Sequence, residues 1–344
     1  MTLRAYILKR LLWSVFLLWI LTTLNFLLVG VDPVAQYGVR GLKPEDAEKI
    51  IEIYGWRAPI DAKYIYYLRN MFTYGLVFPW FGWSTWDKDW VGVGLAQRLP
   101  FTLLVVGTAT AITVTLGLLI GIYTASKEGT RKDRTISAFF LIIWAVPVMF
   151  TEFFAIMLFS YTYTTYGIRI LPVEGLTTRA NPYFEAMPYT TYLDIAWHLI
   201  LPISCLVIVG LGRWILYTRN MMVDALQQDH IVYTARAKGL KRRTLLFKHA
   251  FRTILPQVST MLATVVPTII AGSMITEAVF GIPGIGNWYI KIVYNPDMGV
   301  IRFTDPAATQ AIFFIYANLV IGVNFIADLL AFVFDPRIRL GTRK

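Results

Sequence analysis

The sequence has one cysteine, three histidines and few charged residues, and each shortage excludes a class of protein. A single cysteine, Cys205, allows neither a disulfide within the chain nor a cysteine-based metal site. Charged residues make up 15% of the 344 residues and hydrophobic residues 56%, which is too apolar for an ordinary soluble domain. The sequence contains no glycine-rich phosphate loop and no HExxH motif, so we expect no metal, no cofactor and no ATP hydrolysis by this chain alone. The composition predicts a membrane protein.

Hydrophobic stretches long enough to cross about 30 Å of hydrocarbon, roughly 20 residues of helix, occur six times. They are residues 11–30, 99–125, 136–161, 195–218, 253–276 and 306–334. The first follows a basic start, as a signal peptide would. Its apolar run exceeds the roughly 7 to 15 residues of a signal core, and no small-x-small cleavage site follows it. The sequence therefore predicts an all-α membrane protein with six transmembrane helices.

Basic residues are distributed unevenly between the segments that join these stretches, and they are retained on the cytoplasmic side of membranes. With the N-terminus inside, the inner segments are 1–10, 126–135, 219–252 and 335–344. They carry 19 basic and five acidic residues, whereas the much longer outer segments carry 12 basic and 13 acidic residues. We therefore predict that both termini are cytoplasmic. This topology accounts for most of the net charge of +11 and argues against a nucleic-acid partner.

The predicted organisation along the chain has four parts. Residues 1–30 form the N-terminus and the first transmembrane helix, and residues 31–98 form a long extracytoplasmic loop. Residues 99–334 form a core of five transmembrane helices, and residues 335–344 form a cytoplasmic tail.

Ionisable residues inside a membrane are costly and often functional. The candidates are Glu152, His198, Arg213, Glu277 and Asp328. An intramembrane hydrolase is one alternative, but Asp328 is not part of a close carboxylate pair and no serine lies in a G-x-S-x-G context. We interpret these residues as groups that pair across helices or reach the membrane interface.

The most polar part of the chain, residues 229–256, lies between two hydrophobic stretches. The pattern permits a helix over 221–238, which Gly239 ends in a left-handed conformation. A second helix over 244–252 is predicted to place Leu246, Ala250 and Thr253 on one face. A helix, a tight turn and a second helix facing the cytosol would suit docking into another protein.

This segment and several others resemble the permeases of ABC importers, in particular the oligopeptide/dipeptide branch. The matching sequences are Thr-Ala-Arg-Ala-Lys-Gly-Leu at 234–240 with Lys-His-Ala at 248–250 and Ile-Leu-Pro at 254–256, Leu-Lys-Arg-Leu-Leu at 8–12, Arg-Leu-Pro-Phe-Thr-Leu at 98–103, Val-Pro at 146–147, Thr-Glu-Ala-Val-Phe-Gly-Ile-Pro-Gly-Ile-Gly at 276–286, Asn-Phe-Ile-Ala-Asp at 324–328 and Asp-Pro-Arg-Ile-Arg at 335–339. The resemblance covers most of the chain, and these short sequences occur in the order that the family has. Each is weak alone, but together they identify the chain as a member of that family.

The resemblance implies a type I ABC importer permease fold that works by alternating access. The implied partners are a second homologous permease subunit, two cytoplasmic ATPase subunits that bind the ATP, an extracytoplasmic substrate-binding protein and the lipid bilayer. The implied coupling residues, which would enter a groove of the ATPase, are Thr234, Ala235, Arg236, Ala237, Lys238, Gly239 and Leu240. Arg213 and Glu277 are candidate polar residues of the translocation pathway.

The implied substrates are peptides, with oligosaccharides as the alternative. Residues 80–84 read Trp-Phe-Gly-Trp-Ser, where the peptide branch usually has a Gly-Asp-Leu-Gly-x-Ser pattern, and Tyr233 and Thr234 stand where other ABC importers have an acidic residue. An ion-coupled secondary transporter or a channel is a further alternative. The chain shows no internal repeat of the kind that secondary transporters have and no filter-like loop or charged ring.

The outer loop contains two further patterns. Ala47, Ile50, Ile51 and Tyr54 have the spacing of an amphipathic helix. They are followed by an aromatic cluster: Tyr64, Tyr66, Tyr67, Phe72, Tyr74, Phe78, Trp80, Phe81, Trp83, Trp86 and Trp90. An interfacial aromatic belt with a packed loop core is favoured over a surface that docks a ligand.

Overall fold

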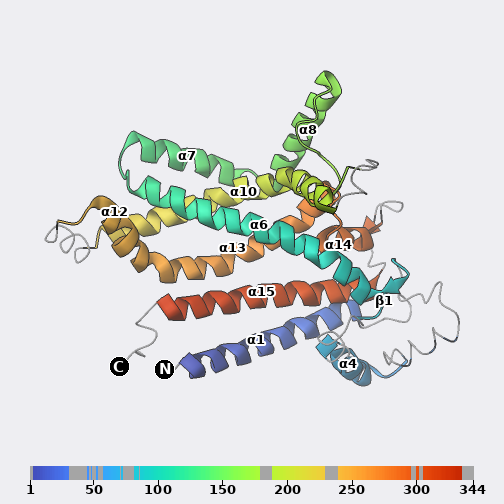
Figure 1. Cartoon of the computed structure of the whole chain (residues 1–344). Helices are drawn as coiled ribbons and strands as arrows, with labels where there is room; N and C mark the ends of the chain where they lie inside the picture. Colours follow the sequence, from blue (N-terminus) through green and yellow to red (C-terminus); the bar gives the residue numbers. More distant parts are fainter. Residues whose placement is uncertain are drawn as a thin grey trace. The chain divides into compact units, whose positions relative to one another are not determined.

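The structure, a computed structural model, describes residues 3–30, 45, 48, 52, 57–69, 71–72, 81–84, 86–178, 188–228, 239–295, 300–301 and 305–334. The chain divides into two compact units, which are described separately. Unit 1 comprises residues 1–10, 104–282 and 323–344, and unit 2 comprises residues 11–103 and 283–322. The described elements are mostly helices (Figure 1).

Three helices contribute residues to both units: α1 (Leu3–Asn25), α6 (Val91–Ala125) and α15 (Pro306–Phe334). The other elements of unit 1 are α7 (Arg131–Ala145), α8 (Val148–Tyr166), α10 (Pro188–Leu226), α12 (Arg242–Thr244), the π-helix η3 (Leu245–Ala250) and α13 (Phe251–Val279). Those of unit 2 are the π-helix η1 (Phe26–Gly30), α4 (Ile60–Arg69), α14 (Ile285–Val293) and two antiparallel pairs of short strands, β1 (Trp83–Ser84) with β2 (Asp89–Trp90) and β3 (Tyr294–Asn295) with β4 (Val300–Ile301).

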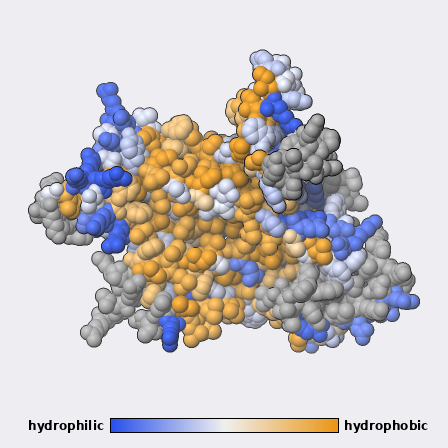
Figure 2. Space-filling view, viewed as in Figure 1, coloured by the Kyte–Doolittle hydropathy of each residue, from blue (hydrophilic) through white to orange (hydrophobic). Residues whose placement is uncertain are grey.

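Within the described residues, five helical segments are long and apolar enough to cross a membrane, or six if a bent pair of helices counts as one span. Five of the six predicted hydrophobic stretches lie in helices without a break, and the third, 136–161, is interrupted at residues 146–147. Over unit 1, hydrophobic residues cover the length of α6, α7 and α10, and hydrophilic residues gather at the end where α12 lies (Figure 2). This arrangement is typical of helices in contact with lipid.

The structure corrects the prediction that the third stretch, residues 136–161, forms a single transmembrane helix. It is not one straight helix, because α7 and α8 meet at an angle of 92°. Pro147 lacks the N–H that a continuing helix needs, and its ring disfavours the helical conformation at the residue before it. Val146 accordingly has a ψ of 122°. The structure ends α8 at Gly167, which is left-handed with a φ of 67°.

Helices α6 and α10 pack closely through small residues. A Cβ atom added to Gly117 would lie 2.5 Å from Cβ of Trp214, and one added to Gly121 would lie 2.6 Å from Cβ of Thr218. One turn earlier on each helix, a Cβ at Gly210 would lie 3.0 Å from Cγ2 of Thr113. Small residues spaced by four let helix backbones approach each other in membranes. The contacts advance along both helices together, so α6 and α10 run in the same direction.

Helix α7 packs on α10 in the opposite direction. A Cβ at Gly212 would lie 2.6 Å from Cβ of Trp144, near the end of α7. At the start of α7, Asp133 accepts hydrogen bonds from Arg219 Nε at 3.0 Å and Nη2 at 2.7 Å. The later part of α7 therefore meets the earlier part of α10. A two-pronged arginine–carboxylate pair of this kind fixes both position and orientation.

Aromatic side chains form much of the packing of unit 2. Phe26 lies 5.3 Å from Tyr64 and 5.2 Å from Tyr67 between ring centroids, and Tyr67 is buried. Phe72 and Phe81 both contact Phe314, at 6.0 and 5.8 Å. Trp83 and Trp90 face each other across the β1–β2 pair. These contacts favour the packed loop core over a stacking surface for a ligand. The predicted amphipathic helix through Ala47, Ile50, Ile51 and Tyr54 lies outside the described residues.

Asp305 joins the start of α15 to the β1–β2 region within unit 2. Its carboxylate accepts hydrogen bonds from the Ser84 hydroxyl and from the backbone N–H groups of Trp86 and Ala308. Burial raises the pKa of Asp305 above its ordinary value, and these three hydrogen bonds oppose the rise in pKa. The carboxylate thus caps the helix while it holds the β1–β2 segment in place.

Candidate functional site

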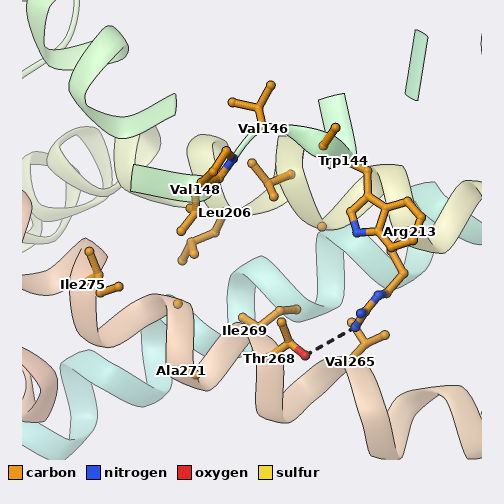
Figure 3. Close-up of a pocket in the computed structure, with 15 residues that line it drawn as sticks. Trp144, Val146, Val148, Leu206, Arg213, Val265, Thr268, Ile269, Ala271 and Ile275 are labelled. Atoms are coloured by element: carbon orange, nitrogen blue, oxygen red, sulfur yellow. Dashed lines mark hydrogen bonds between the residues drawn. The ribbon is translucent and has the colours of Figure 1, made fainter. Parts of the chain in front are cut away.

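A cavity of about 550 Å³ lies in unit 1, where the break between α7 and α8 faces α10 and α13 (Figure 3). Its volume falls within the range of small-ligand pockets, roughly 300 to 1,000 Å³. Most of its lining is aliphatic, contributed by residues such as Val146, Leu206, Val265 and Ile275. The Val146-Pro147 break, which interrupts the hydrophobic stretch, supplies one wall.

Among the described residues that line the cavity, Arg213 on α10 is the one that carries a charge. Its Nη1 donates a hydrogen bond to Oγ1 of Thr268 on α13 at 3.4 Å, and its guanidinium carbon lies 5.8 Å from the ring centroid of Trp144 (Figure 3). Its Nε atom is buried without a hydrogen-bond partner. Within the part of the chain that the structure describes, no carboxylate forms an ion pair with Arg213.

The neighbouring residue, Gly212, explains why Trp144 can lie beside Arg213. A Cβ at position 212 would lie 2.7 Å from the carbonyl oxygen of Phe140 and 3.1 Å from the backbone nitrogen of Trp144. These are backbone atoms of α7, which cannot rotate away as the end of a side chain could. Glycine therefore allows the close approach that brings the indole to the guanidinium.

Glu277, the second predicted pathway residue, does not line this cavity. It lies near the end of α13 and its side chain is fully buried. The structure therefore does not bring Arg213 and Glu277 together in one pocket. Glu152 on α8 is also fully buried and accepts a hydrogen bond from the Thr276 hydroxyl, which links α8 to α13.

The remaining ionisable candidates have local partners. Nη1 of Arg10 lies 2.9 Å from Oδ2 of Asp328, which confirms pairing between helices for that carboxylate. Nδ1 of His198 lies 2.9 Å from the backbone oxygen of Asp194 on the preceding turn of the same helix. Arg213 differs from these residues because its recorded partners are a hydroxyl and an indole ring.

The predicted coupling segment is only partly described. Thr234, Ala235, Arg236, Ala237 and Lys238 lie outside the described residues, so their helix remains a prediction.

Gly239 and Leu240 are described, and Gly239 has a φ of 57°, which confirms the predicted left-handed conformation. Lys241, Arg242 and Arg243 follow it and are all exposed.

The turn that contains these basic residues is anchored to neighbouring segments of unit 1. Arg242 donates a hydrogen bond to the backbone oxygen of Ser126 in the turn between α6 and α7. Nε2 of Gln227, just beyond α10, donates to Oε1 of Glu128 at 3.2 Å. The ends of α6 and α10 and the start of α12 therefore meet at one end of the unit.

The predicted second helix exists, but its buried face differs from the prediction. Leu246 and Ala250 are buried as expected, whereas Thr253 is exposed and Ile254 is buried in its place. The cause is the π-helix η3, whose i→i+5 hydrogen bonds widen the turn and shift the following residues around the helix axis. The periodicity of an α-helix cannot anticipate that shift.

One continuous helical segment, Arg242–Val279, contains both exposed basic residues and part of the cavity lining. The exposed basic residues occupy its beginning, and Val265, Thr268 and Ile269 of the same segment line the cavity. At 1.5 Å per residue, Arg242 and Thr268 are roughly 40 Å apart along the helix. A displacement of the basic end can therefore reach the cavity through a single element.

Comparisons with known proteins show the family to which the chain belongs. The profile of the family described as "Binding-protein-dependent transport system inner membrane component" matches residues 117–340, which is more than half of the chain. The chain belongs to this family. It is therefore a membrane component of a transport system that works with a binding protein, and the resemblance found in the sequence is confirmed.

Similar proteins match this family member along almost its whole length. It is 32% identical to the oligopeptide transport system permease protein AppB of Bacillus subtilis (strain 168), over 97% of this chain and 99% of the relative. It is 31% identical to the di/tripeptide transport system permease protein DppB of Pseudomonas aeruginosa (strain UCBPP-PA14), over 92% of this chain and 94% of the relative. It is 29% identical to the dipeptide transport system permease protein DppB of Escherichia coli (strain K12), over 93% of this chain and 94% of the relative.

Sequence reasoning missed Trp144, Gly212 and Thr268 as neighbours of Arg213. The available signals were a glycine directly before an arginine in an apolar stretch and a proline three residues after a tryptophan. Neither signal says which helices meet, because those contacts join residues 55 or more positions apart.

Proposed function

We propose that this chain forms half of the translocation pathway of an ABC importer for dipeptides and oligopeptides. The relatives compared above are named for oligopeptide, di/tripeptide and dipeptide transport, and they match more than nine-tenths of the chain. None of these names refers to oligosaccharides, so peptides are the substrate class that we propose.

The observation that carries the proposal is the continuity of the helical segment Arg242–Val279. Its exposed basic beginning follows the left-handed Gly239, and its middle borders the cavity beside Arg213. A rigid element that joins a docking surface to a binding cavity can convert movement at one into movement at the other. Residues 234–240 would contact a cytoplasmic ATPase subunit, which binds and hydrolyses the ATP.

The proposed assembly contains a second homologous permease subunit, two ATPase subunits and an extracytoplasmic binding protein. In this assembly the chain adds no covalent chemistry and binds no cofactor. Arg213 and Glu277 remain the proposed polar residues of the pathway. Arg213 has the stronger support, because it borders the cavity.

The proposed topology has six crossings with both termini in the cytoplasm. It is supported by the direction of the helices, since α6 and α10 run the same way and α7 runs the other way. The bent pair α7 and α8 would then form one crossing between them. We expect a cysteine at Thr178 to react with a membrane-impermeant thiol reagent from outside only, and one at Lys241 from inside only. Reaction of both from the same side would contradict this topology.

The proposed substrate and assembly can be tested by reconstitution. We expect the chain with its permease, ATPase and binding-protein partners to import peptides, and cello- or malto-oligosaccharides not to compete. The chain alone should show neither ATPase activity nor uptake. Competition by the oligosaccharides but not by peptides would reject the substrate class. Uptake by the chain alone, driven by an ion gradient, would reject the ABC mechanism in favour of a secondary transporter.

A further inference from the structure

We propose that Arg213 binds a carboxylate of the transported ligand, so that the cavity selects ligands with one free carboxylate and an apolar body. For peptides this group is the C-terminal carboxylate. The inference rests on the proposed function for the identity of the ligand, but the carboxylate site itself rests on the cavity.

The first argument is charge. A cation in a predominantly apolar, intramembrane environment is costly unless an anion or several hydrogen bonds compensate it. Arg213 has one recorded hydrogen bond, to the neutral hydroxyl of Thr268, and no ion pair with a carboxylate in the described part of the chain. The positive charge of Arg213 therefore favours an anion in the cavity and would repel a metal cation.

The second argument is geometry. A guanidinium has five N–H donors in a planar fork that matches the two oxygens of a carboxylate. Trp144 lies beside one side of the group and Thr268 receives one donor, which holds the fork in place without neutralising it (Figure 3). The buried Nε of Arg213 has no hydrogen-bond partner. That atom is out of reach of a ligand, so the donors available at the edge of the cavity are those of Nη1 and Nη2 that Thr268 does not receive.

The third argument is the rest of the lining. The side chains of Leu206, Ile269 and Ile275 offer only hydrocarbon, and the volume of about 550 Å³ is large enough for a small peptide. Apolar ligand side chains would be accommodated there without further polar partners. One fixed charge with an apolar surround is the usual design of a site that orients a ligand by a single polar group.

None of the carboxylates that the structure describes on α7, α8, α10 and α13 borders the cavity. Glu152 accepts a hydrogen bond from Thr276, and Glu277 is fully buried near the end of α13. The remaining alternative is an acidic residue of the second permease subunit, which would make Arg213 part of the subunit interface. That alternative predicts a different experimental result.

The test uses Ala271→Cys as a reporter in the assembled complex without binding protein. Ala271 lines the cavity and is exposed, whereas the native Cys205 is buried. Labelling by a small maleimide is measured against increasing concentrations of leucyl-leucine, its C-terminal amide and the non-peptide 4-methylpentanoate. We expect the two carboxylates to protect the reporter at least about tenfold more effectively than the amide.

Replacing the arginine should remove that discrimination. With Arg213→Gln, protection by leucyl-leucine should need about 10- to 100-fold more ligand, while protection by the amide stays within about twofold. Arg213→Lys should retain part of the preference, since it keeps the charge but loses the fork. Arg131→Gln, which removes an exposed arginine outside the cavity, serves as the matched control.

Three results would overturn the inference: equal protection by acid and amide in the unmodified protein, an equal loss for both in Arg213→Gln, or a loss of the second permease from the purified Arg213→Gln complex. The last would assign Arg213 to the subunit interface. Failure of the proposed function gives a different pattern, in which 4-methylpentanoate protects through Arg213 but the complete transporter imports no peptide. In that case the carboxylate site stands and the peptide assignment fails.

Discussion

The interface between α6 and α10 and the basic turn at the start of α12 both depend on glycine, but in different physical ways. At Gly117 the helix is regular and an added Cβ atom would lie 2.5 Å from Cβ of Trp214. The close contact between the helices therefore requires a residue without a side chain. At Gly239 nothing lies within 4 Å of an added Cβ, yet φ is 57°, so what is required is backbone freedom.

The difference separates two parts of the proposed mechanism. The α6–α10 interface is a tightly packed contact, and tight packing makes a structure respond as a rigid body. The basic turn is exposed on the surface, where side chains remain available to a partner. A substitution in the first region should affect stability, whereas one in the second should affect transport without unfolding the chain.

The largest effect is expected for Gly239→Val. A β-branched residue disfavours the left-handed conformation by at least about 1 kcal/mol and would distort the turn or extend the preceding helix. We expect the variant to be inserted and stable but to lose at least about tenfold in uptake and in substrate-stimulated ATPase activity of the assembled complex.

Gly129→Val is the matched control for that prediction. Gly129 is also left-handed, with a φ of 74°, also has open space around it, and lies in the turn between α6 and α7 outside residues 234–240. It should bear a similar conformational cost but keep most of the transport. Equal losses in the two variants would show that strain alone is responsible, and normal uptake by Gly239→Val would remove the coupling assignment.

A smaller effect, on stability, is expected for Gly117→Ala. The added methyl group would force α6 away from Trp214, at a cost of about 1 to 3 kcal/mol, as for other overpacked contacts. Thermal unfolding of the purified complex in detergent should show a lower midpoint. Gly107→Ala on the same helix meets nothing within 4 Å and should be neutral or slightly stabilising. If both variants unfold at the same temperature, the α6–α10 contact is not as close as described.

The smallest effect is expected for Lys241→Glu in the exposed turn. Exposed charge pairs contribute at most about 1 kcal/mol, so binding of the ATPase subunits should weaken roughly three- to fivefold. The difference should diminish as salt is raised, because exposed charges are screened. Lys132→Glu, an exposed charge at the start of α7, provides the comparison. An effect of Lys241→Glu that persists in high salt would indicate a buried contact instead.

Arg236→Glu extends the same prediction to the segment that the structure leaves undescribed. We expect it to reduce substrate-stimulated ATPase activity and uptake, with a salt dependence like that of Lys241→Glu. If positive charge in this loop served only to set topology, each variant would be tolerated, because seven other basic residues would remain in it between positions 219 and 252.

Much of the helical framework could be predicted from hydrophobic length alone. The stretch 306–334 coincides with α15, and 253–276 lies inside α13. The boundaries near polar residues were less predictable. Helix α10 extends to Leu226, beyond the hydrophobic stretch that ends at residue 218 and into the helix predicted over 221–238, because polar residues can continue a helix after it leaves the membrane. The left-handed Gly239 was also predictable, since it depends on local backbone sterics.

The cavity could be predicted only in part. Arg213 was identifiable because an isolated charge in an apolar stretch demands an explanation, and Val146-Pro147 marked a break. Hydrophobic patterns cannot report the 92° bend, because Pro147 removes one hydrogen bond but does not set an angle. The shift of the buried face from Thr253 to Ile254 likewise depends on the π-helix η3.

The sequence by itself determined that the chain is a multi-helix membrane protein with a basic turn that begins at a left-handed glycine, because bilayer thickness, charge asymmetry and backbone sterics act on neighbouring residues. Only the tertiary structure decided that Trp144, Arg213 and Thr268 share one cavity and that Glu277 lies outside it. It also decided that Gly117, rather than Gly107, meets another helix. Such contacts depend on how helices far apart in the sequence pack together, and identical local sequence would permit several packings.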